Sequence, residues 1–117
     1  MELRYKILHN PRCRKSREAL NFLKSVKIEF ETIFYLKDSL KENEIRKIID
    51  NSNLKIEDFI RKQETLWKSC LKNKILSKNE IINILVNNPI LIQRPIFFSS
   101  LKSVIAIPPE KVYEVVE

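Results

Sequence analysis

One cysteine stands among several positively charged side chains, at the point where a short apolar segment gives way to a helical pattern. The stretch reads His9-Asn10-Pro11-Arg12-Cys13-Arg14-Lys15-Ser16. A cysteine reacts as its thiolate, and both nearby cations and a helix N-terminus lower the pKa of a thiol. The same positive groups would attract an anionic substrate. Cys13 is therefore the candidate nucleophile, and an anion is the candidate substrate.

Cys13 and Ser16 form a Cys-x-x-Ser motif, which cannot close an internal disulfide. We expect the Ser16 hydroxyl and the free N–H groups of the first helical turn to donate to the thiolate. Asn10 and Pro11 would shape the turn that precedes it. His9 would either add positive charge or satisfy its hydrogen bonds at the end of a strand, and the sequence leaves both alternatives open.

The other residues around Cys13 limit the kind of site. Arg14 and Arg17 are expected to face water, because the cations of one helical turn cannot all point at one anion. A tyrosine-phosphatase type of loop would need an arginine six residues after the cysteine, and that residue is Ala19. An adduct on Cys13 would have to be resolved by an outside thiol or by Cys70.

A second group of residues, Gln93-Arg94-Pro95-Ile96, precedes a predicted strand. A proline there fixes how the chain enters the strand, and a cis peptide bond is possible before it. The planar fork of an arginine such as Arg94 suits a tetrahedral oxyanion. For Arg61, by contrast, the local sequence predicts only an ordinary residue on a helix surface.

Composition excludes several classes of function. The chain has no glycine, whereas a P-loop and a dinucleotide-binding fingerprint both need glycines. Two cysteines and one histidine make a zinc site improbable, so no metal is expected. The net charge is +7, but basic and acidic residues are interleaved along the chain, so nucleic acid is not an expected partner.

No long apolar run or secretory signal is present, which predicts a cytoplasmic protein without a membrane span.

Hydrophobic periodicity predicts the order of the elements. Strands are expected at 5–8, 28–35, 96–98 and 104–107, and helices at 15–26, 42–49, 56–61, 78–88 and from 108 onwards. Capping boxes, which begin at Ser39 and Ser77, would open two of the helices. Without glycine, left-handed turn positions would fall to asparagines at helix ends, such as Asn51 and Asn88.

The first strand, helix and strand make a βαβ unit with a parallel strand pair. The full order of βαβ, further helices and then ββα predicts an α/β chain with the thioredoxin-like fold and a mixed four-stranded sheet. A helical insertion of about 39–88 would lie in its middle. No linker or internal repeat divides the chain, so residues 1–117 are expected to form a single domain.

Five blocks of sequence carry a family resemblance. They are His-Asn-Pro-x-Cys-x-x-Ser-Arg from His9, Tyr35-Leu36, Ile60-Arg61-Lys62, Asn88 to Ile96, and Pro108-Pro109-Glu110-Lys111-Val112. Together they resemble the glutaredoxin-coupled arsenate reductase family, whose superfamily also contains the Spx-type transcription regulators. The resemblance runs from residue 5 to the end and implies the thioredoxin fold.

The resemblance also implies a mechanism. In that family the cysteine attacks arsenate, glutathione displaces the covalent adduct, and glutaredoxin reduces the mixed disulfide as arsenite leaves. Glutathione would then be a co-substrate, and no bound cofactor or metal is implied. The residues that match the family's functional positions are Cys13 as nucleophile, Arg61 and Arg94 as oxyanion ligands, and His9, Asn10, Ser16 and a cis Pro95 in support.

The sequence departs from the family at one oxyanion position. The family's third arginine directly precedes the Pro-x-Glu of the last helix, and here that residue is Ile107. Lys102 and Lys111 are the candidates to replace its charge. Cys70 would be either a resolving thiol or a partly buried thiol on a helix, and a family that recruits external glutathione favours the second.

The alternative function is that of a Spx-like redox regulator or interaction module that binds RNA polymerase. Such regulators commonly carry a second cysteine where this chain has Ser16. The serine therefore argues against a regulator and in favour of an enzyme.

Overall fold

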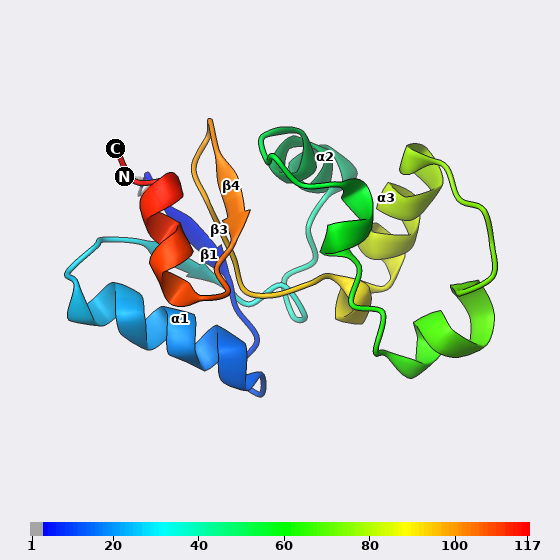
Figure 1. The fold of residues 1–117 in the computed structure, drawn as a ribbon, viewed down its shortest axis with the longest axis horizontal. Coiled ribbons are helices and arrows are strands. Elements are labelled where there is room, and N and C mark those ends of the chain that lie inside the picture. Colours follow the sequence, from blue (N-terminus) through cyan, green and yellow to red (C-terminus); the bar gives the residue numbers. More distant parts are fainter. Residues whose placement is uncertain (1–3) are drawn as a thin grey trace.

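The computed structural model describes residues 4–117 and has a four-stranded sheet as its organising element (Figure 1). The strands are β1 (Lys6–Leu8), β2 (Glu31–Ile33), β3 (Ile96–Phe98) and β4 (Ser103–Ile105), in the order β2-β1-β3-β4. β1 pairs with β2 in parallel, whereas the β1–β3 and β3–β4 pairs are antiparallel. The predicted mixed sheet is confirmed, although β2 is shorter than the 28–35 strand expected from the sequence.

Three α-helices and four shorter helical segments complete the described part of the chain. The α-helices are α1 (Arg14–Ser25), α2 (Glu42–Asp50) and α3 (Lys78–Asn87). The 3-10 segments are η1 (Ile56–Phe59), η3 (Pro89–Leu91) and η4 (Pro109–Glu114), and η2 (Trp67–Leu71) is a π-helical turn. Within residues 4–117, none of these helices has the length and apolar character that a membrane crossing requires.

One of the two predicted capping boxes is present and the other is displaced. At α3, the Ser77 hydroxyl accepts the Glu80 N–H (3.2 Å), and the Glu80 carboxylate accepts the Ser77 N–H (3.0 Å). At α2, the Glu44 carboxylate accepts the N–H of Lys41 (2.9 Å), so that Lys41 is the N-cap. The prediction of a cap at Ser39 is therefore wrong, and the helix begins after Lys41.

The left-handed positions also differ from the expectation. Among the described residues, only Lys27, just after α1, has a positive φ, of 59°. Asn51 and Asn88 do follow α2 and α3, but their φ angles are −86° and −136°. These helices end without a left-handed residue, so the expectation that asparagines take that role is wrong.

The two faces of the sheet bury two separate apolar clusters, because neighbouring residues of a strand point to opposite faces. On one face, Ile7 and Phe97 pack with α1 and η4. On the other, Leu8 and Ile96 pack with α2, α3 and the loops between them. Figure 1 shows the same arrangement, with α1 and the C-terminal η4 on one side and α2 and α3 on the other.

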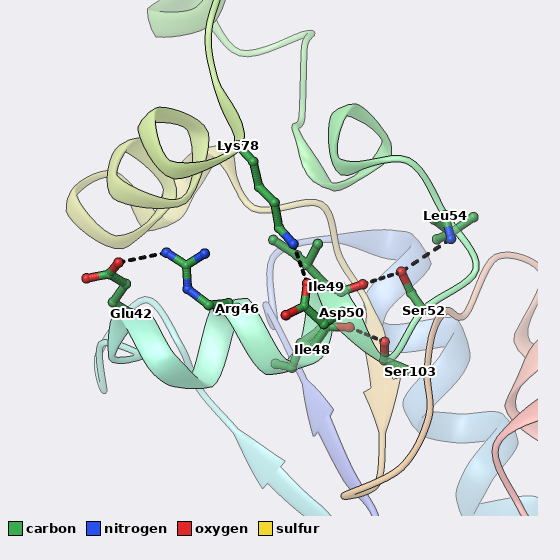
Figure 2. Close-up of polar contacts among 9 residues, drawn as sticks. All are labelled: Glu42, Arg46, Ile48, Ile49, Asp50, Ser52, Leu54, Lys78 and Ser103. Atoms are coloured by element: carbon green, nitrogen blue, oxygen red, sulfur yellow. Dashed lines mark hydrogen bonds and ion pairs between the residues drawn. The ribbon is translucent and has the colours of Figure 1, made fainter.

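Polar contacts attach the helical insertion to the sheet (Figure 2). The Ser103 hydroxyl, at the start of β4, donates to the Ile48 carbonyl of α2. Lys78 of α3 forms an ion pair with Asp50 at the end of α2. These contacts join α2 to β4 and to the start of α3.

Candidate active site

Cys13 lies at the N-terminus of α1, at the end of the loop that leaves β1. It is the N-cap residue and has an extended backbone (φ −95°, ψ 121°), which brings its side chain near the free N–H groups of the first turn. The Asn10 carbonyl accepts the Cys13 N–H (3.0 Å), and the Asn10 side-chain oxygen accepts the Arg12 N–H (3.0 Å). Asn10 is buried and fixes this loop, in line with the turn-shaping role expected of it.

The surroundings of Cys13 lower the pKa of its thiol below the ordinary value. Burial works in the opposite direction and raises this pKa, but four contacts together outweigh it. They are the backbone N–H of Ser16, the charge of Arg94, the backbone N–H of Lys15, and a hydrogen bond from the Arg94 side chain. The thiol is partly exposed and not in a disulfide. Helix N–H groups and a guanidinium thus favour the thiolate.

Ser16 acts on Cys13 through its backbone and not through its hydroxyl. The fully buried Ser16 hydroxyl accepts the Asn10 N–H (3.0 Å) and lies 2.6 Å from Nδ1 of His9. Of Ser16, only the backbone N–H is among the groups that lower the pKa of Cys13. The expectation that this hydroxyl donates to Cys13 is wrong; it joins the end of β1 to the first turn of α1.

His9 is buried (4% exposed), and its surroundings lower the pKa of its imidazole. Burial is the largest cause, and the charges of Lys24 and Arg17 act in the same direction. A lowered pKa keeps the ring neutral at neutral pH. Of the two alternatives that the sequence left open, the geometry favours the hydrogen-bonding role.

The cations next to Cys13 in the sequence point towards solvent. Arg14 pairs with Glu18 (Nε to Oε1, 3.1 Å), and Arg17 donates to the Pro11 carbonyl (2.9 Å). The exposed side chains are Arg12, Arg14, Lys15 and Arg17. The contacts that lower the thiol pKa include none of these side-chain charges. The positive charge at the sulfur therefore comes from elsewhere in the chain.

Arg94 is the cation that reaches Cys13. Its side chain is buried (4% exposed), and Nη1 donates to the carbonyls of Ile90 (2.8 Å) and Ile92 (3.3 Å). The Arg94–Pro95 peptide bond is cis, as the family resemblance implied. Two carbonyls hold Nη1, and the guanidinium lowers the pKa of Cys13 through its charge and a hydrogen bond.

Arg61 lies in an extended segment and not on a helix. Ile60 forms an isolated antiparallel bridge with Ile92, so this segment runs beside the one that leads to Arg94. The pairing ends η1 before Arg61, which makes the expected position on a helix surface wrong. The Arg61 Nε contacts Glu64 Oε2 at 2.9 Å.

Position 107 carries no charge, and neither candidate lysine replaces it. Ile107, Lys102 and Lys111 line a groove of about 580 Å³ beside β4, whose lining does not include Cys13 or either site arginine. Neither lysine is among the groups that shift the pKa of Cys13. The compensation considered from the sequence is therefore not seen.

Cys70 is exposed and lies on η2, where its sulfur is 3.5 Å from the Ser69 hydroxyl. The expectation of partial burial is wrong, because this π-helical turn has no buried residue.

Tyr35, two residues after β2, is a candidate functional residue that the sequence analysis did not single out. Its side chain is fully buried. Burial raises the pKa of its hydroxyl to about 12, and four nearby charges add smaller effects: Arg94 lowers it, Cys13 raises it, Arg61 lowers it and Glu64 raises it. Tyr35 is therefore close enough to the thiol and both arginines for their charges to act on its hydroxyl. The only sequence signal was its place in the Tyr35-Leu36 block.

The assembled groups suit nucleophilic attack on an anion. A thiol favoured as thiolate supplies the nucleophile, and the Arg94 guanidinium supplies positive charge beside it. Among residues 4–117, no group of three His, Cys, Asp or Glu side chains is placed to hold a metal ion.

The sheet order, the layers and the thiol at the start of α1 define the thioredoxin-like fold, with a helical insertion between β2 and β3. The chain belongs to the ArsC family, whose model matches residues 8–115. It is 38% identical over 120 residues to the protein YfgD of Escherichia coli (strain K12), across 99% of each chain. It is 34% identical over 111 residues to an arsenate reductase of Haemophilus influenzae, across 93% of this chain and 96% of the relative.

A solved structure, an arsenate reductase from Vibrio cholerae, superposes with a TM-score of 0.89 at 30% identity, across 99% of this chain and 100% of that one. The family resemblance and the fold predicted from the sequence are confirmed.

Proposed function

We propose that this protein is an arsenate reductase-like monothiol oxidoreductase in which Cys13 is the nucleophile. The observation that carries the proposal is the lowered pKa of Cys13 beside the buried Arg94. Membership of the ArsC family and similarity to the Haemophilus and Vibrio arsenate reductases support arsenate, or a related oxyanion, as the substrate.

In the first step, the Cys13 thiolate attacks the arsenic atom of arsenate. A sulfur–arsenic bond forms, and one arsenate oxygen leaves as water after protonation. Arg94 donates to the thiolate and is placed to follow the charge as it moves to the arsenate oxygens. Arg61 neutralises the remaining charge of the oxyanion, in competition with its ion pair to Glu64.

In the second step, glutathione attacks the Cys13 sulfur as a thiolate. A disulfide bond forms, the electron pair of the sulfur–arsenic bond goes to arsenic, and As(V) becomes As(III), which leaves as arsenite. Glutaredoxin then reduces the Cys13–glutathione disulfide. An external thiol suits this chain because Ser16, which occupies the second position of the Cys-x-x-Ser motif, cannot resolve the adduct. Dependence on a glutathione pool also suits a cytoplasmic location.

The test is a coupled assay with glutathione, glutaredoxin, glutathione reductase and NADPH, in which arsenate is compared with the mixed disulfide of glutathione and 2-mercaptoethanol. We expect arsenate-dependent NADPH oxidation in the wild type and in Cys70→Ser, and none in Cys13→Ser. Full activity in Cys13→Ser would refute the role of the thiol. Turnover of the disulfide alone would refute an oxyanion substrate and leave a disulfide reductase.

A further inference from the structure

The exposed cations next to Cys13 have no part in the chemistry described so far. The motif His-Asn-Pro-x-Cys-x-x-Ser-Arg leaves three positions open, and in this chain Arg12, Arg14 and Lys15 occupy them. All three side chains are exposed. None of their side-chain charges is among the causes that lower the pKa of Cys13. Activation of the thiol therefore does not explain why every open position carries a cation.

Arg12 and Lys15 lie on either side of the thiol along the chain. Arg12 directly precedes Cys13, the N-cap of α1, and the backbone N–H of Lys15, in the first turn, forms a hydrogen bond with the Cys13 sulfur. Helical side chains tilt towards the N-terminus of their helix, which is the end of α1 where the partly exposed thiol lies. Both cations are therefore within one helical turn of the thiol and open to solvent.

Acidic side chains offset only part of this positive charge. Glu18 is the only acidic residue between His9 and Ile28. Its carboxylate lies 3.1 Å from Nε of Arg14 and 4.0 Å from Nζ of Lys15. The Arg12 side chain forms no ion pair or hydrogen bond within residues 4–117. The surface around the thiol thus keeps an excess of positive charge, which attracts anions over a range of about 8–10 Å.

The position of these charges indicates the kind of anion that they fit. Arsenate carries its charge on the oxygens bonded to the reacting atom, and that charge would meet Arg94, which acts on the sulfur itself. The charges of Arg12 and Lys15 lie further out. They suit a partner whose negative groups are several bonds away from its own reacting atom. Glutathione has this form, because its carboxylates are remote from its sulfur and outnumber its ammonium group.

We propose that Arg12 and Lys15 are specificity-determining residues that bind the carboxylates of an anionic thiol, glutathione, as its sulfur attacks Cys13. The proposal rests on the proposed function for the identity of the adduct that is resolved. The bonds that form and break are those of the second step given above, and the two cations exchange no proton or electron in it. They attract an anionic thiol to the site and repel a cationic one.

The test is a thiol–disulfide exchange that needs no arsenate. In a Cys70→Ser background, Cys13 is reacted with oxidised glutathione or with the disulfide of glutathione diethyl ester, in which the carboxylates are blocked. The Cys13 thiolate attacks one sulfur of the reagent, a mixed disulfide forms, and the other half leaves as a thiolate. Intact-protein mass spectrometry gives the two rates, and their ratio cancels any change in the reactivity of the thiol.

The variant is Arg12→Gln/Lys15→Gln. Its matched control is Lys41→Gln/Lys47→Gln, which removes the same charge from exposed residues at α2. The core of that helix packs on the face of the sheet opposite to α1. Alkylation of Cys13 by iodoacetamide, a neutral reagent, verifies that each variant keeps an accessible and reactive thiol.

At low ionic strength, the rate ratio of oxidised glutathione to the ester disulfide should fall by about 3- to 30-fold in the Arg12→Gln/Lys15→Gln variant. The anionic reagent loses two attractive charges there, and the cationic ester loses two repulsive ones. About 1 M NaCl, which screens charges beyond about 3 Å, should bring the wild-type ratio close to that of the variant. The control variant should keep the wild-type ratio, and alkylation by iodoacetamide should be the same in all three proteins.

An unchanged ratio in Arg12→Gln/Lys15→Gln would overturn the proposal. An equal fall in Lys41→Gln/Lys47→Gln would also overturn it, since the cause would then be the net charge of the protein and not two cations beside the thiol. If the ratio falls as expected but the wild type does not reduce arsenate in the coupled assay, the preference for an anionic thiol stands and only the oxyanion substrate is refuted.

Discussion

Replacement of Arg94 by glutamine should raise the pKa of Cys13 and leave the thiol largely protonated at neutral pH. Arg94 acts on the sulfur twice, through its charge and through a hydrogen bond. A hydrogen bond to a charged group contributes about 1.5–3 kcal/mol. Since one pKa unit corresponds to about 1.4 kcal/mol, the pKa should rise by about 1–2 units. The N–H groups of Ser16 and Lys15 still lower the pKa of Cys13 in this variant, but they offset less of the increase that burial causes.

The assay is the pH dependence of Cys13 alkylation by iodoacetamide in a Cys70→Ser background. Its midpoint should move upward by about 1–2 units in Arg94→Gln. Arg14→Gln is the matched control: Arg14 is adjacent to Cys13 but exposed and paired with Glu18, so its midpoint should stay within about 0.3 units.

Arg94→Gln also removes the donor of the Ile90 and Ile92 carbonyls, which should lower the unfolding free energy by about 1–3 kcal/mol. Urea unfolding verifies that the variant is folded under the alkylation conditions. Arg94→Lys, which keeps a positive charge, should shift the midpoint by less than Arg94→Gln. A folded Arg94→Gln with an unchanged midpoint would refute the assignment of Arg94 as the source of positive charge at the sulfur.

Three further outcomes follow from the same contacts. Ser16→Ala leaves the buried Asn10 N–H without its acceptor, so urea unfolding should show a loss of about 1–3 kcal/mol, and unchanged stability would contradict the assigned hydroxyl contacts. Ile107→Arg should tighten arsenate binding by about 10-fold or more if the guanidinium restores a charge-assisted contact; an unchanged KM in the coupled assay would mean that the missing arginine does not limit binding. Because the folded state lowers the pKa of Cys13, the unfolded chain binds more protons in the window between the folded pKa and the ordinary value of about 8.5, and the wild type should gain stability relative to Cys13→Ser as pH rises through that window. A stability difference that is constant with pH, from urea unfolding at each pH, would contradict the lowered pKa.

The parts of the site that follow local rules could be predicted from the sequence. A cysteine directly before a helical pattern predicts an N-cap thiol, and Cys13 occupies that position. The box at Ser77 is present because its hydroxyl and the Glu80 carboxylate satisfy each other's backbone N–H groups. The similar pattern at Ser39 gave the wrong start for α2, since Glu44 reaches Lys41 instead.

The parts that depend on contacts between distant segments could not be predicted from local patterns. The adjacent cations looked like the source of charge at Cys13, whereas burial and two carbonyl acceptors direct Arg94 there. Helical periodicity placed Arg61 on a helix, but the bridge between Ile60 and Ile92 draws its segment into an extended form. That the buried Tyr35 hydroxyl has no hydrogen-bond partner among the described residues is visible only once every neighbour is in place.

The ionisation of Cys13 is tested most directly by its thiolate absorbance at 240 nm. The Cys70→Ser protein is titrated from acid to alkaline pH, and Cys13→Ser in the same background provides the baseline. Because helix N–H groups and Arg94 outweigh burial, the transition should have its midpoint clearly below the ordinary thiol value of about 8.5. A midpoint at or above that value would contradict the account of this site.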